Sequence, residues 1–300
     1  MAIEIVPVTP GFAAEVGDVD LARLTPEELE AVKQAFWTYA VLVFPGQTLD
    51  AEQHLAFAAR FGPHETTIAV HRPDADKKLR VRREFADVSN LDPEGRIWKA
   101  DSRVREFERA NRLWHTDSSF KRLPALASFL YARSIPPVGG RTEFADLRAA
   151  YDALPEATQR RLEGRVAEHC IAHSRARIGF TAFTEEERTA MPPVPQLLVR
   201  TLPQSGRKTL YLASHAGRIV GLPEADGRAL IDELIAHATQ RQFVYSHRWR
   251  AQDLVMWDDR CTMHRAMGYD DLRFPRDVQR ATVSDVANSC EQEGVQAVLA

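Results

Sequence analysis

Two histidines and one carboxylate in this sequence have the types and spacing of a metal site. His115 and Asp117 are separated by one residue, and His264 lies far downstream. If His115 and Asp117 lie on a β-strand or at its end, their side chains point to the same side, because side-chain direction alternates along a strand. Two imidazoles and one carboxylate form a ligand set of non-haem iron(II) sites, which leaves other metal positions open. The pattern therefore predicts an iron site.

A His-x-Asp pair on its own is a weak signal, because a buried histidine beside a carboxylate is also a common structural pair. Its context strengthens the metal interpretation. Four segments along the chain supply this context: the His-x-Asp segment, a segment with two glycines, a segment that contains His264, and a segment with two arginines. The segments are residues 111–120 (NRLWHTDSSF), 136–146 (PPVGGRTEFAD), 253–265 (DLVMWDDRCTMHR) and 276–282 (RDVQRAT).

In this order the four segments resemble the iron(II)/2-oxoglutarate-dependent dioxygenases of the taurine dioxygenase family. The resemblance extends from about residue 41 to about residue 285, which is nearly the whole chain. Within the family it is strongest to members that act on aryloxyalkanoates of the 2,4-dichlorophenoxyacetate type. It implies a mainly β fold with inserted helices, built on a double-stranded β-helix (jelly roll) core.

The resemblance also implies roles for the polar residues of these segments. His115, Asp117 and His264 are the implied iron ligands and catalytic residues. Thr142 and Arg276 are implied to bind the distal carboxylate of 2-oxoglutarate. The implied cofactor and co-substrates are Fe(II), 2-oxoglutarate and O2, with ascorbate helpful in vitro.

Arg280 is left to bind the acid group of the substrate, and guanidinium suits this task because it bonds a carboxylate through two N–H groups. The resemblance places Asn111 and His215 on the substrate side. Each has a structural alternative, since Asn111 can satisfy loop backbone and His215 can be an ordinary buried histidine.

One departure from the family pattern concerns the spacing from His264 to Arg276, which is about one residue longer than usual. We expect Phe274 and Pro275 to absorb the extra residue in a turn. If they do not, the arginine that binds 2-oxoglutarate shifts to Arg273.

Bulk properties limit the alternatives. The 39 basic and 42 acidic residues give a net charge of −3, which argues against a nucleic-acid partner. Three cysteines without metal-like spacing fit a reducing compartment, and no apolar run has the length of a membrane span. We therefore expect a cytoplasmic protein without a membrane partner. A homo-oligomer is a separate expectation that these properties do not determine.

No linker or internal repeat divides the 300 residues, which favours one catalytic domain, 1–300, with a core of about 41–286 and a flexible C-terminal tail, 287–300. Helix-start signals precede residues 26 and 51, and an amphipathic pattern covers 225–239. The stretch 64–111 is polar and irregular, so it is either a substrate-covering loop or contains short strands that the pattern does not locate.

The resemblance implies that the enzyme hydroxylates the carbon alpha to the carboxylate of an aryloxyalkanoate. The products are a phenol and glyoxylate, with succinate and CO2 from the co-substrate. The substrate partner is then a small aromatic carboxylic acid. A sulfonate or alkyl sulfate dioxygenase of the same family is the first alternative. A non-catalytic metal- or 2-oxoglutarate-binding module and a zinc hydrolase are weaker ones.

Overall fold

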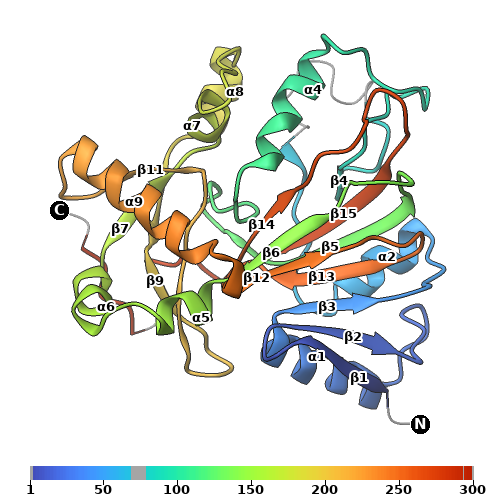
Figure 1. The fold of residues 1–300 in the computed structure, drawn as a ribbon, viewed down its shortest axis with the longest axis horizontal. Helices are drawn as coiled ribbons and strands as arrows, with labels where there is room; N and C mark the ends of the chain where they lie inside the picture. The colour runs from blue at the N-terminus through green and yellow to red at the C-terminus, as the bar shows by residue number, and fades with distance from the viewer. Residues whose placement is uncertain (1–2, 69–78, 293, 299–300) are drawn as a thin grey trace.

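A large antiparallel-rich sheet dominates one side of the molecule (Figure 1). The computed structural model describes residues 3–68, 79–292 and 294–298. The sheet has the order β1-β2-β3-β13-β5-β15-β4, and its only parallel pair among the described strands is β2 with β3. Its strands are β1 (Glu4–Thr9), β2 (Ala13–Gly17), β3 (Val41–Phe44), β4 (Phe85–Asp87), β5 (Ala125–Ser134), β13 (Leu254–Asp258) and β15 (Asp277–Ser284).

A smaller sheet with the order β12-β6-β14 lies beside the first and completes the core. Its strands are β6 (Thr142–Asp146), β12 (Val244–His247) and β14 (Thr262–Ala266). Phe144 of β6 packs in one buried cluster with Leu130 of β5 and with Val255 and Trp257 of β13. The apolar faces of the two sheets therefore form the interior that supports the polar site at its open end.

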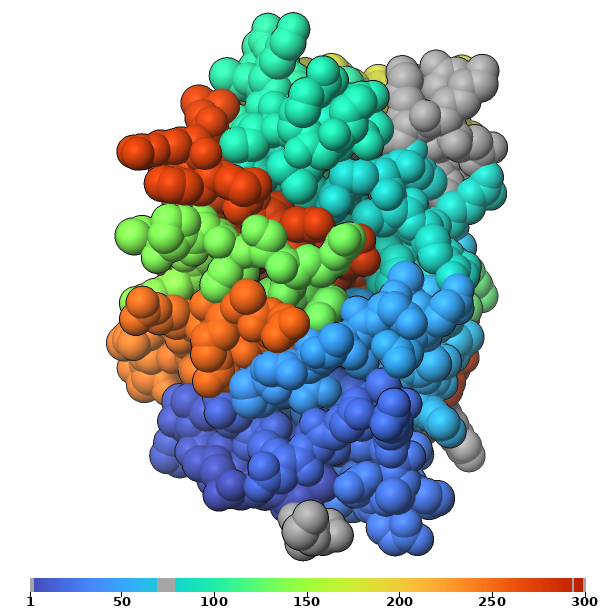
Figure 2. Space-filling view, turned by 90° about the vertical axis from the view of Figure 1, so that its right-hand side faces the viewer, coloured from blue at the N-terminus to red at the C-terminus, as the bar shows by residue number. Residues whose placement is uncertain are grey.

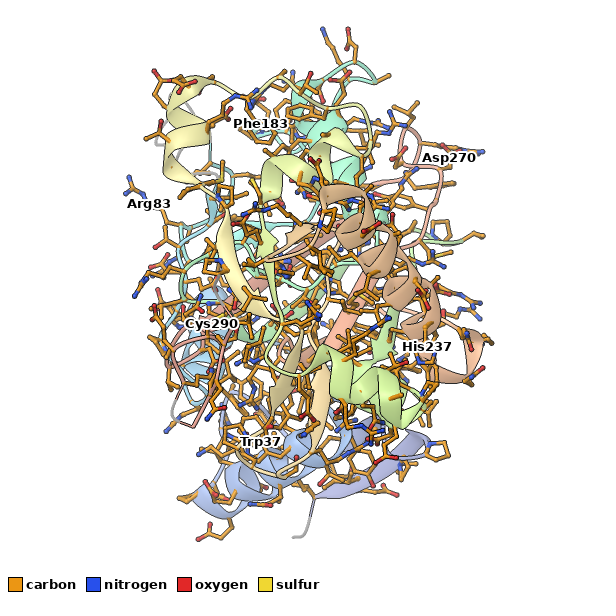
Figure 3. All side chains as sticks on the ribbon, turned by 90° about the vertical axis from the view of Figure 1, so that its left-hand side faces the viewer. Trp37, Arg83, Phe183, His237, Asp270 and Cys290 are labelled. Atoms are coloured by element: carbon orange, nitrogen blue, oxygen red, sulfur yellow. The ribbon has the colours of Figure 1, made fainter. Side chains whose placement is uncertain are left out.

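Two further small sheets and most helices cover this core. The remaining strands are β7 (Val166–His169), β8 (Val194–Leu197), β9 (Val199–Thr201), β10 (Lys208–Leu210) and β11 (Ala216–Ile219). The helices are α1 (Pro26–Tyr39), α2 (Ala51–Ala58), α4 (Arg103–Glu108), α5 (Leu147–Asp152), α6 (Glu156–Leu162), α7 (Ile171–Ala176), α8 (Glu185–Ala190) and α9 (Glu224–Ala238), with 3-10 turns η2 (Arg109–Arg112) and η3 (Arg241–Phe243). Helix α9 lies against β11 (Figure 1), and side chains fill the space between these layers (Figure 3).

The two N-terminal helices begin where the sequence predicts. Thr25 and Glu28 form a reciprocal capping box at the start of α1, and Asp50 caps α2 in the same way. Helix α2 ends at Ala58, before Gly62. Gly62 lies so close to β15 that an added Cβ would be 3.1 Å from the Ser284 carbonyl oxygen. This close approach to β15, and not the end of the helix, accounts for the glycine.

The irregular stretch 64–111 contains short elements that periodicity does not reveal. Strand β4 pairs with β15, and α4 leads directly into η2. Residues 69–78 of this stretch lie outside the described residues. The C-terminal tail, expected to be loose, is anchored at its start, because the buried Ser289 hydroxyl accepts from the amide of Leu197 at 2.9 Å. In the described parts of the chain, every helix is too short or too polar to cross a membrane.

Candidate metal centre and its two anion sites

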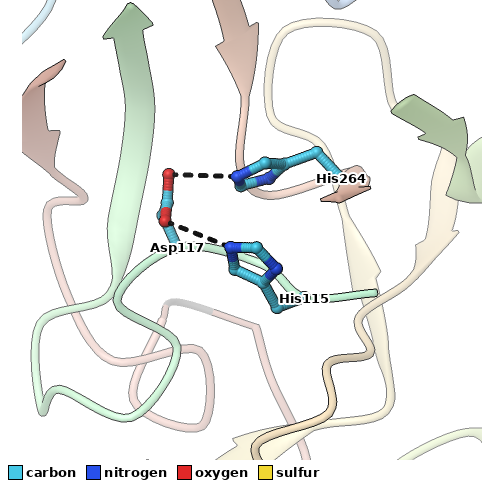
Figure 4. A group of neighbouring side chains, drawn as sticks. All are labelled: His115, Asp117 and His264. Atoms are coloured by element: carbon cyan, nitrogen blue, oxygen red, sulfur yellow. Dashed lines mark ion pairs between the residues drawn. The ribbon is translucent and has the colours of Figure 1, made fainter. Parts of the chain in front are cut away.

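His115, Asp117 and His264 come together in the folded chain, and all three are buried (Figure 4). One ligand atom from each lies within 4.8 Å of the others. Nε2 of His115 is 3.9 Å from Oδ1 of Asp117, and Nε2 of His264 is 3.7 Å from Oδ2 of the same carboxylate. The side chains converge on one point from two separate segments of the chain.

Backbone pairing brings these segments together. The amides of His115 and His264 donate to each other's carbonyl oxygens, at 3.0 and 2.8 Å. His264 lies within β14, opposite Phe144 of β6. His115 forms an isolated bridge, and Asp117 lies in the turn that follows. His115 and Asp117 therefore lie at a bridge and in the turn after it, and not within a regular strand, so their convergence depends on the turn.

Distant elements hold each residue of this turn. The Thr116 hydroxyl is fully buried and lies 2.8 Å from the carbonyl oxygen of Leu212. The Ser118 hydroxyl donates to Glu65 at 2.6 Å, and Ser118 has a φ of 49°, a left-handed conformation that is costly for a residue with a Cβ. The surrounding contacts thus maintain a turn that the local sequence alone does not favour.

Three neighbours contact Asp117 itself. Ser128 of β5 donates to Oδ2 at 2.9 Å, and Arg280 of β15 donates to Oδ1. The buried carboxylate of Asp259 accepts from the Asp117 amide at 3.1 Å and from Trp257 Nε1 at 3.0 Å. These bonds fix both the main chain and the carboxylate of the central acid.

Burial sets the protonation of the three side chains. It lowers the pKa of His115 and of His264, so both imidazoles are neutral at pH 7, the form that binds a metal. Burial opposes ionisation of Asp117, but the charge of Arg280 and the hydrogen bond from Ser128 favour it, and the pKa of Asp117 lies below its usual value. Burial also raises the pKa of Asp259 well above its usual value, assisted by the Asp117 charge.

The donor set fits an iron(II) ion. Nδ1 of His115 donates to the Leu113 carbonyl oxygen at 2.8 Å, which leaves Nε2 unprotonated on the side that faces Asp117. Nδ1 of His264 is buried and has no partner in the parts of the chain that the structure describes. Two neutral imidazoles and one carboxylate on one face would hold such a metal and leave its other positions for ligands.

A pocket opens beside this centre. His115 and Asp117 line it, together with Arg280, Asn111 and His215. The three residues expected on the substrate side therefore share one cavity with two of the metal ligands. Part of the wall is apolar and comes from α4, α7 and the turn after Asp117. These residues are Phe107, Phe120 and Ile171.

Asn111 and His215 already have protein partners. The Asn111 amide donates to Glu108 of the preceding helix. His215 is buried, pairs through Nδ1 with the Ser174 hydroxyl at 2.9 Å, and packs edge-on against Phe120 with ring centroids 4.9 Å apart. Burial and the charge of Arg175 hold the pKa of His215 well below its usual value. A neutral His215 can form part of the wall without competing for an acid substrate.

Arg276 does not line this pocket and lies at a separate polar site. It is buried, its Nη1 donates to the Val88 carbonyl oxygen at 3.0 Å, and its Nε has no partner in the described part of the structure. Burial lowers its pKa, and the phenol of Tyr269 is the neighbour that opposes this shift. A buried guanidinium without a carboxylate partner among the described residues requires an anion.

Trp249 connects Arg276 to Thr142. Its indole Nε1 donates to the Thr142 hydroxyl at 3.0 Å, and its ring centroid is 6.0 Å from Cζ of Arg276. The Thr142 hydroxyl proton thus remains available to a ligand. Thr142 is paired with Ala266, two residues from His264 on β14, so Thr142 and His264 lie on the same face of the small sheet.

The alternative arginine is placed differently. Arg273 is exposed, and its guanidinium stacks on Phe274 with Cζ 5.0 Å from the ring centroid. Arg276 precedes β15 by one residue, and the strand register shifts at Asp277. Arg276 therefore lies outside the regular strand, whereas Arg280 lies within β15 and has the Asp117 carboxylate as its partner.

Several residues around the site escape sequence reasoning. Ser128, Trp249 and Asp259 contact proposed site residues, but nothing in their local sequence distinguishes them from core or turn residues. For Asp259 the one hint in the sequence is its position in the acidic pair Asp258–Asp259, just before the strand that carries His264.

Comparison with known proteins agrees with this geometry. The family described as "Taurine catabolism dioxygenase TauD, TfdA family" matches residues 4–282, so the chain belongs to this family. The chain is 47% identical to an alpha-ketoglutarate-dependent 2,4-dichlorophenoxyacetate dioxygenase of Cupriavidus pinatubonensis, over 96% of this chain and 99% of that protein. It is 36% identical to an (S)-phenoxypropionate/alpha-ketoglutarate-dioxygenase of Sphingobium herbicidovorans, over 90% and 91%.

A solved structure has the same fold. AAD-2, in complex with Mn(II) and N-oxalylglycine, superposes with a TM-score of 0.88 and is 45% identical, covering 97% of this chain and all of that one (100%). The family resemblance and the jelly-roll fold expected from the sequence are both confirmed.

Proposed function

We propose that this chain is a 2-oxoglutarate-dependent dioxygenase that hydroxylates the carbon alpha to the carboxylate of an aryloxyalkanoate. The observation that carries the proposal is the pocket with His115, Asp117 and Arg280 in its lining and apolar side chains in part of its wall. A cation beside a metal centre and an apolar wall fit a substrate with an acid group and an aromatic ring. The names of the two relatives, which mention phenoxyacetate and phenoxypropionate, support this substrate class.

Different residues bind the two anions, which are the substrate and 2-oxoglutarate. Arg280 binds the substrate carboxylate and so fixes the reacting carbon relative to the metal centre. Arg276 and Thr142 bind the distal carboxylate of 2-oxoglutarate, and Phe120 and Ile171 surround the aromatic ring and exclude water. Iron(II), 2-oxoglutarate and O2 supply the oxidising chemistry when bound.

The overall reaction balances without hydrolysis. One oxygen atom of O2 enters the substrate at the carbon between ether oxygen and carboxylate, and the other enters succinate as CO2 leaves 2-oxoglutarate. With an aryloxyacetate the hydroxylated product is a hemiacetal, which separates into a phenol and glyoxylate; an aryloxypropionate gives a hemiketal, which separates into a phenol and pyruvate. The alkyl–oxygen bond of the ether is broken in this last step.

Oxygen uptake tests the proposal. The purified protein is given Fe(II), ascorbate and 2-oxoglutarate with a panel of aryloxyacetates, aryloxypropionates, alkyl sulfonates and alkyl sulfates. We expect phenol release with the aryloxy acids, matched by succinate. Turnover confined to sulfonates or sulfates would favour the alternative dioxygenase, and no succinate with any acid would favour a binding module.

The expected homo-oligomer stays a prediction, and light scattering of the purified protein tests it.

A further inference from the structure

The loop of residues 267–276 connects β14 to β15 and carries Arg276 at its end. It contains no helix or strand, so neighbouring segments and not a β-ladder set the position of the Arg276 guanidinium. In Figure 2 this red loop lies at the surface between the teal segment before α4 and the green segment after β5, and Asp270 lies at the outer edge of the molecule in Figure 3. Its outer part is therefore exposed while its end is buried.

The turn before Thr142 anchors the start of the loop. The amide of Met267 donates to the Arg141 carbonyl oxygen at 2.8 Å, and the amide of Gly140 donates to the carbonyl oxygen of Gly268 at 3.2 Å. Gly139 has a φ of 80°, and an added Cβ there would lie 2.8 Å from the Gly268 carbonyl oxygen. The glycine is required because two backbones meet at this point.

Asn90 anchors the end of the loop with every polar atom of its side chain. Its Nδ2 donates to the carbonyl oxygens of Asp271 and Phe274, at 2.8 and 2.9 Å, and its Oδ1 accepts from the Arg276 amide at 2.8 Å. The side chain is buried and satisfies three backbone groups that no regular element satisfies.

The backbone around Asn90 adds to this anchor. The Asn90 amide donates to the Arg276 carbonyl oxygen at 3.3 Å, and the Val88 carbonyl oxygen accepts from the Arg276 guanidinium at 3.0 Å. Residues 88–90 thus hold both the main chain and the side chain of Arg276. Asn90 lines neither the substrate pocket nor the metal centre.

We propose that Asn90 is a positioning residue for 2-oxoglutarate, acting through Arg276. The inference rests on the proposed role of Arg276 as the site of the distal carboxylate. A guanidinium binds a carboxylate bidentately only in a narrow range of orientations, so displacement of the loop end weakens that bond. Asn90 is absent from the metal cluster and from the pocket lining, to which its neighbours Ser89 and Leu91 belong. We therefore expect binding of the metal and of the aryloxy acid to change less than binding of 2-oxoglutarate.

The chemistry of the side chain allows a strict test. Asparagine supplies two donors and one acceptor at this position, whereas aspartate keeps the acceptor, loses both donors and faces two carbonyl oxygens with a charge. Asn90→Asp should therefore weaken 2-oxoglutarate binding at least as much as Asn90→Ala does. Arg96→Ala is the matched control, since Arg96 lies in the same segment, is 72% exposed and pairs with Asp92 and Glu94 only among the described residues.

The experiment measures the dissociation constant of 2-oxoglutarate by calorimetry with Mn(II)-loaded protein, and the kinetics with Fe(II). For both Asn90 variants we expect the dissociation constant and the Michaelis constant for this co-substrate to rise about tenfold or more. We expect kcat at saturating 2-oxoglutarate, the Michaelis constant for the aryloxyacetate and the Mn(II) affinity to stay within about twofold of the wild type. The Arg96 variant should match the wild type in all of these.

Arg276→Ala distinguishes failure of the proposed role of Arg276 from failure of the proposed role of Asn90. If this variant binds 2-oxoglutarate normally, the proposed role of Arg276 fails. If it binds weakly while both Asn90 variants bind normally, or if an Asn90 variant lowers kcat and leaves the Michaelis constant for the co-substrate unchanged, the role of Asn90 is overturned. Should the Asn90 variants not fold, hydrogen exchange of the wild type decides. Slow exchange of the Arg276 amide before 2-oxoglutarate is added supports the anchor, and fast exchange overturns it.

Discussion

His115 and His264 are bonded to each other through both backbone groups, with N···O distances of 3.0 and 2.8 Å, and their ring centroids lie 4.2 Å apart. Two of the three proposed metal ligands are thus held by main-chain contacts that do not involve their imidazoles. The main chain of the site is thus part of the paired scaffold around β14. Loss of one imidazole should therefore remove a ligand without opening the scaffold.

The first prediction concerns His264→Ala. We expect turnover to fall below detection and Mn(II) affinity to drop by at least about tenfold, the scale seen when groups around a metal are removed. The midpoint of thermal unfolding should change by only a few degrees. Calorimetry and circular dichroism measure these quantities. His237→Ala is the control, because His237 lies on α9, bonds the Ala150 carbonyl oxygen, and belongs neither to the metal cluster nor to the pocket lining. Full activity of the His264 variant would remove the ligand assignment.

The second prediction separates the arginines near β15. Arg276→Ala should weaken 2-oxoglutarate binding by roughly 2–5 kcal/mol, the usual cost of truncating one partner of a buried charge pair. Arg273→Ala should have almost no effect, because Arg273 is exposed and contacts Phe274. Calorimetric titration of both variants with 2-oxoglutarate measures the difference. A large effect of Arg273 with none of Arg276 would show that the longer spacing is accommodated differently.

The third prediction concerns the hydroxyl of Thr142. Thr142→Val keeps the shape of the side chain but leaves the indole of Trp249 without its acceptor and removes one donor to the co-substrate. We expect a rise in the Michaelis constant for the co-substrate that is smaller than that of Arg276→Ala, because a neutral hydroxyl is a weaker donor than a guanidinium. Steady-state kinetics with varied 2-oxoglutarate measure this rise, and Thr142→Ser should restore most of the loss. A serine variant as impaired as the valine variant would argue against the hydroxyl.

The sequence indicated which three side chains could meet at a metal site, and the structure brings His115, Asp117 and His264 together. Their geometry could not be predicted, since Asp117 lies in a turn held by Leu212, Glu65 and Asp259, residues from three distant segments. The helices at residues 26 and 51 were predictable from their caps, which are local. The short elements of 85–112 were not, because β4 exists only through its pairing with β15.

The fourth prediction concerns stability against pH. Burial lowers the pKa of His54 from 6.5 to about 4, and its ring donates to the Phe129 carbonyl oxygen at 3.0 Å. The unfolded chain therefore binds a proton at higher pH than the folded chain does. The contribution of His54 is fully present above pH 6.5 and is lost as the pH falls toward about 4.

His54→Gln tests this sign. Between about pH 6.5 and 4 the variant should show a smaller dependence of unfolding free energy on pH, by up to about 1.4 kcal/mol per pH unit. Urea unfolding at several pH values measures the slope, which is independent of any constant loss of packing in the variant. An unchanged slope would show that His54 does not titrate between the folded and unfolded chains in this range.

The last prediction is that Arg280 recognises the substrate carboxylate and so selects the class of substrate. Arg280 lines the pocket, and in the structure its guanidinium bonds Asp117. Its Nε is buried and has no partner among the described residues, so the same guanidinium has a donor left for a second acid. Arg280→Gln should raise the Michaelis constant for aryloxyacetates markedly and leave the dissociation constant of 2-oxoglutarate nearly unchanged. It should also uncouple the reaction, so that succinate forms without matching phenol, because the reacting carbon is no longer held in place. Because Asp117 loses a partner in this variant, Mn(II) affinity is measured separately and assays are run at saturating Fe(II).

Neutral esters of the same aryloxy acids should react poorly with the wild type, which tests the role of the substrate's charge without any substitution in the protein. Equal turnover of esters and acids, or unchanged aryloxyacetate kinetics in the glutamine variant at full metal occupancy, would remove the carboxylate-binding role and with it the strongest support for the substrate class.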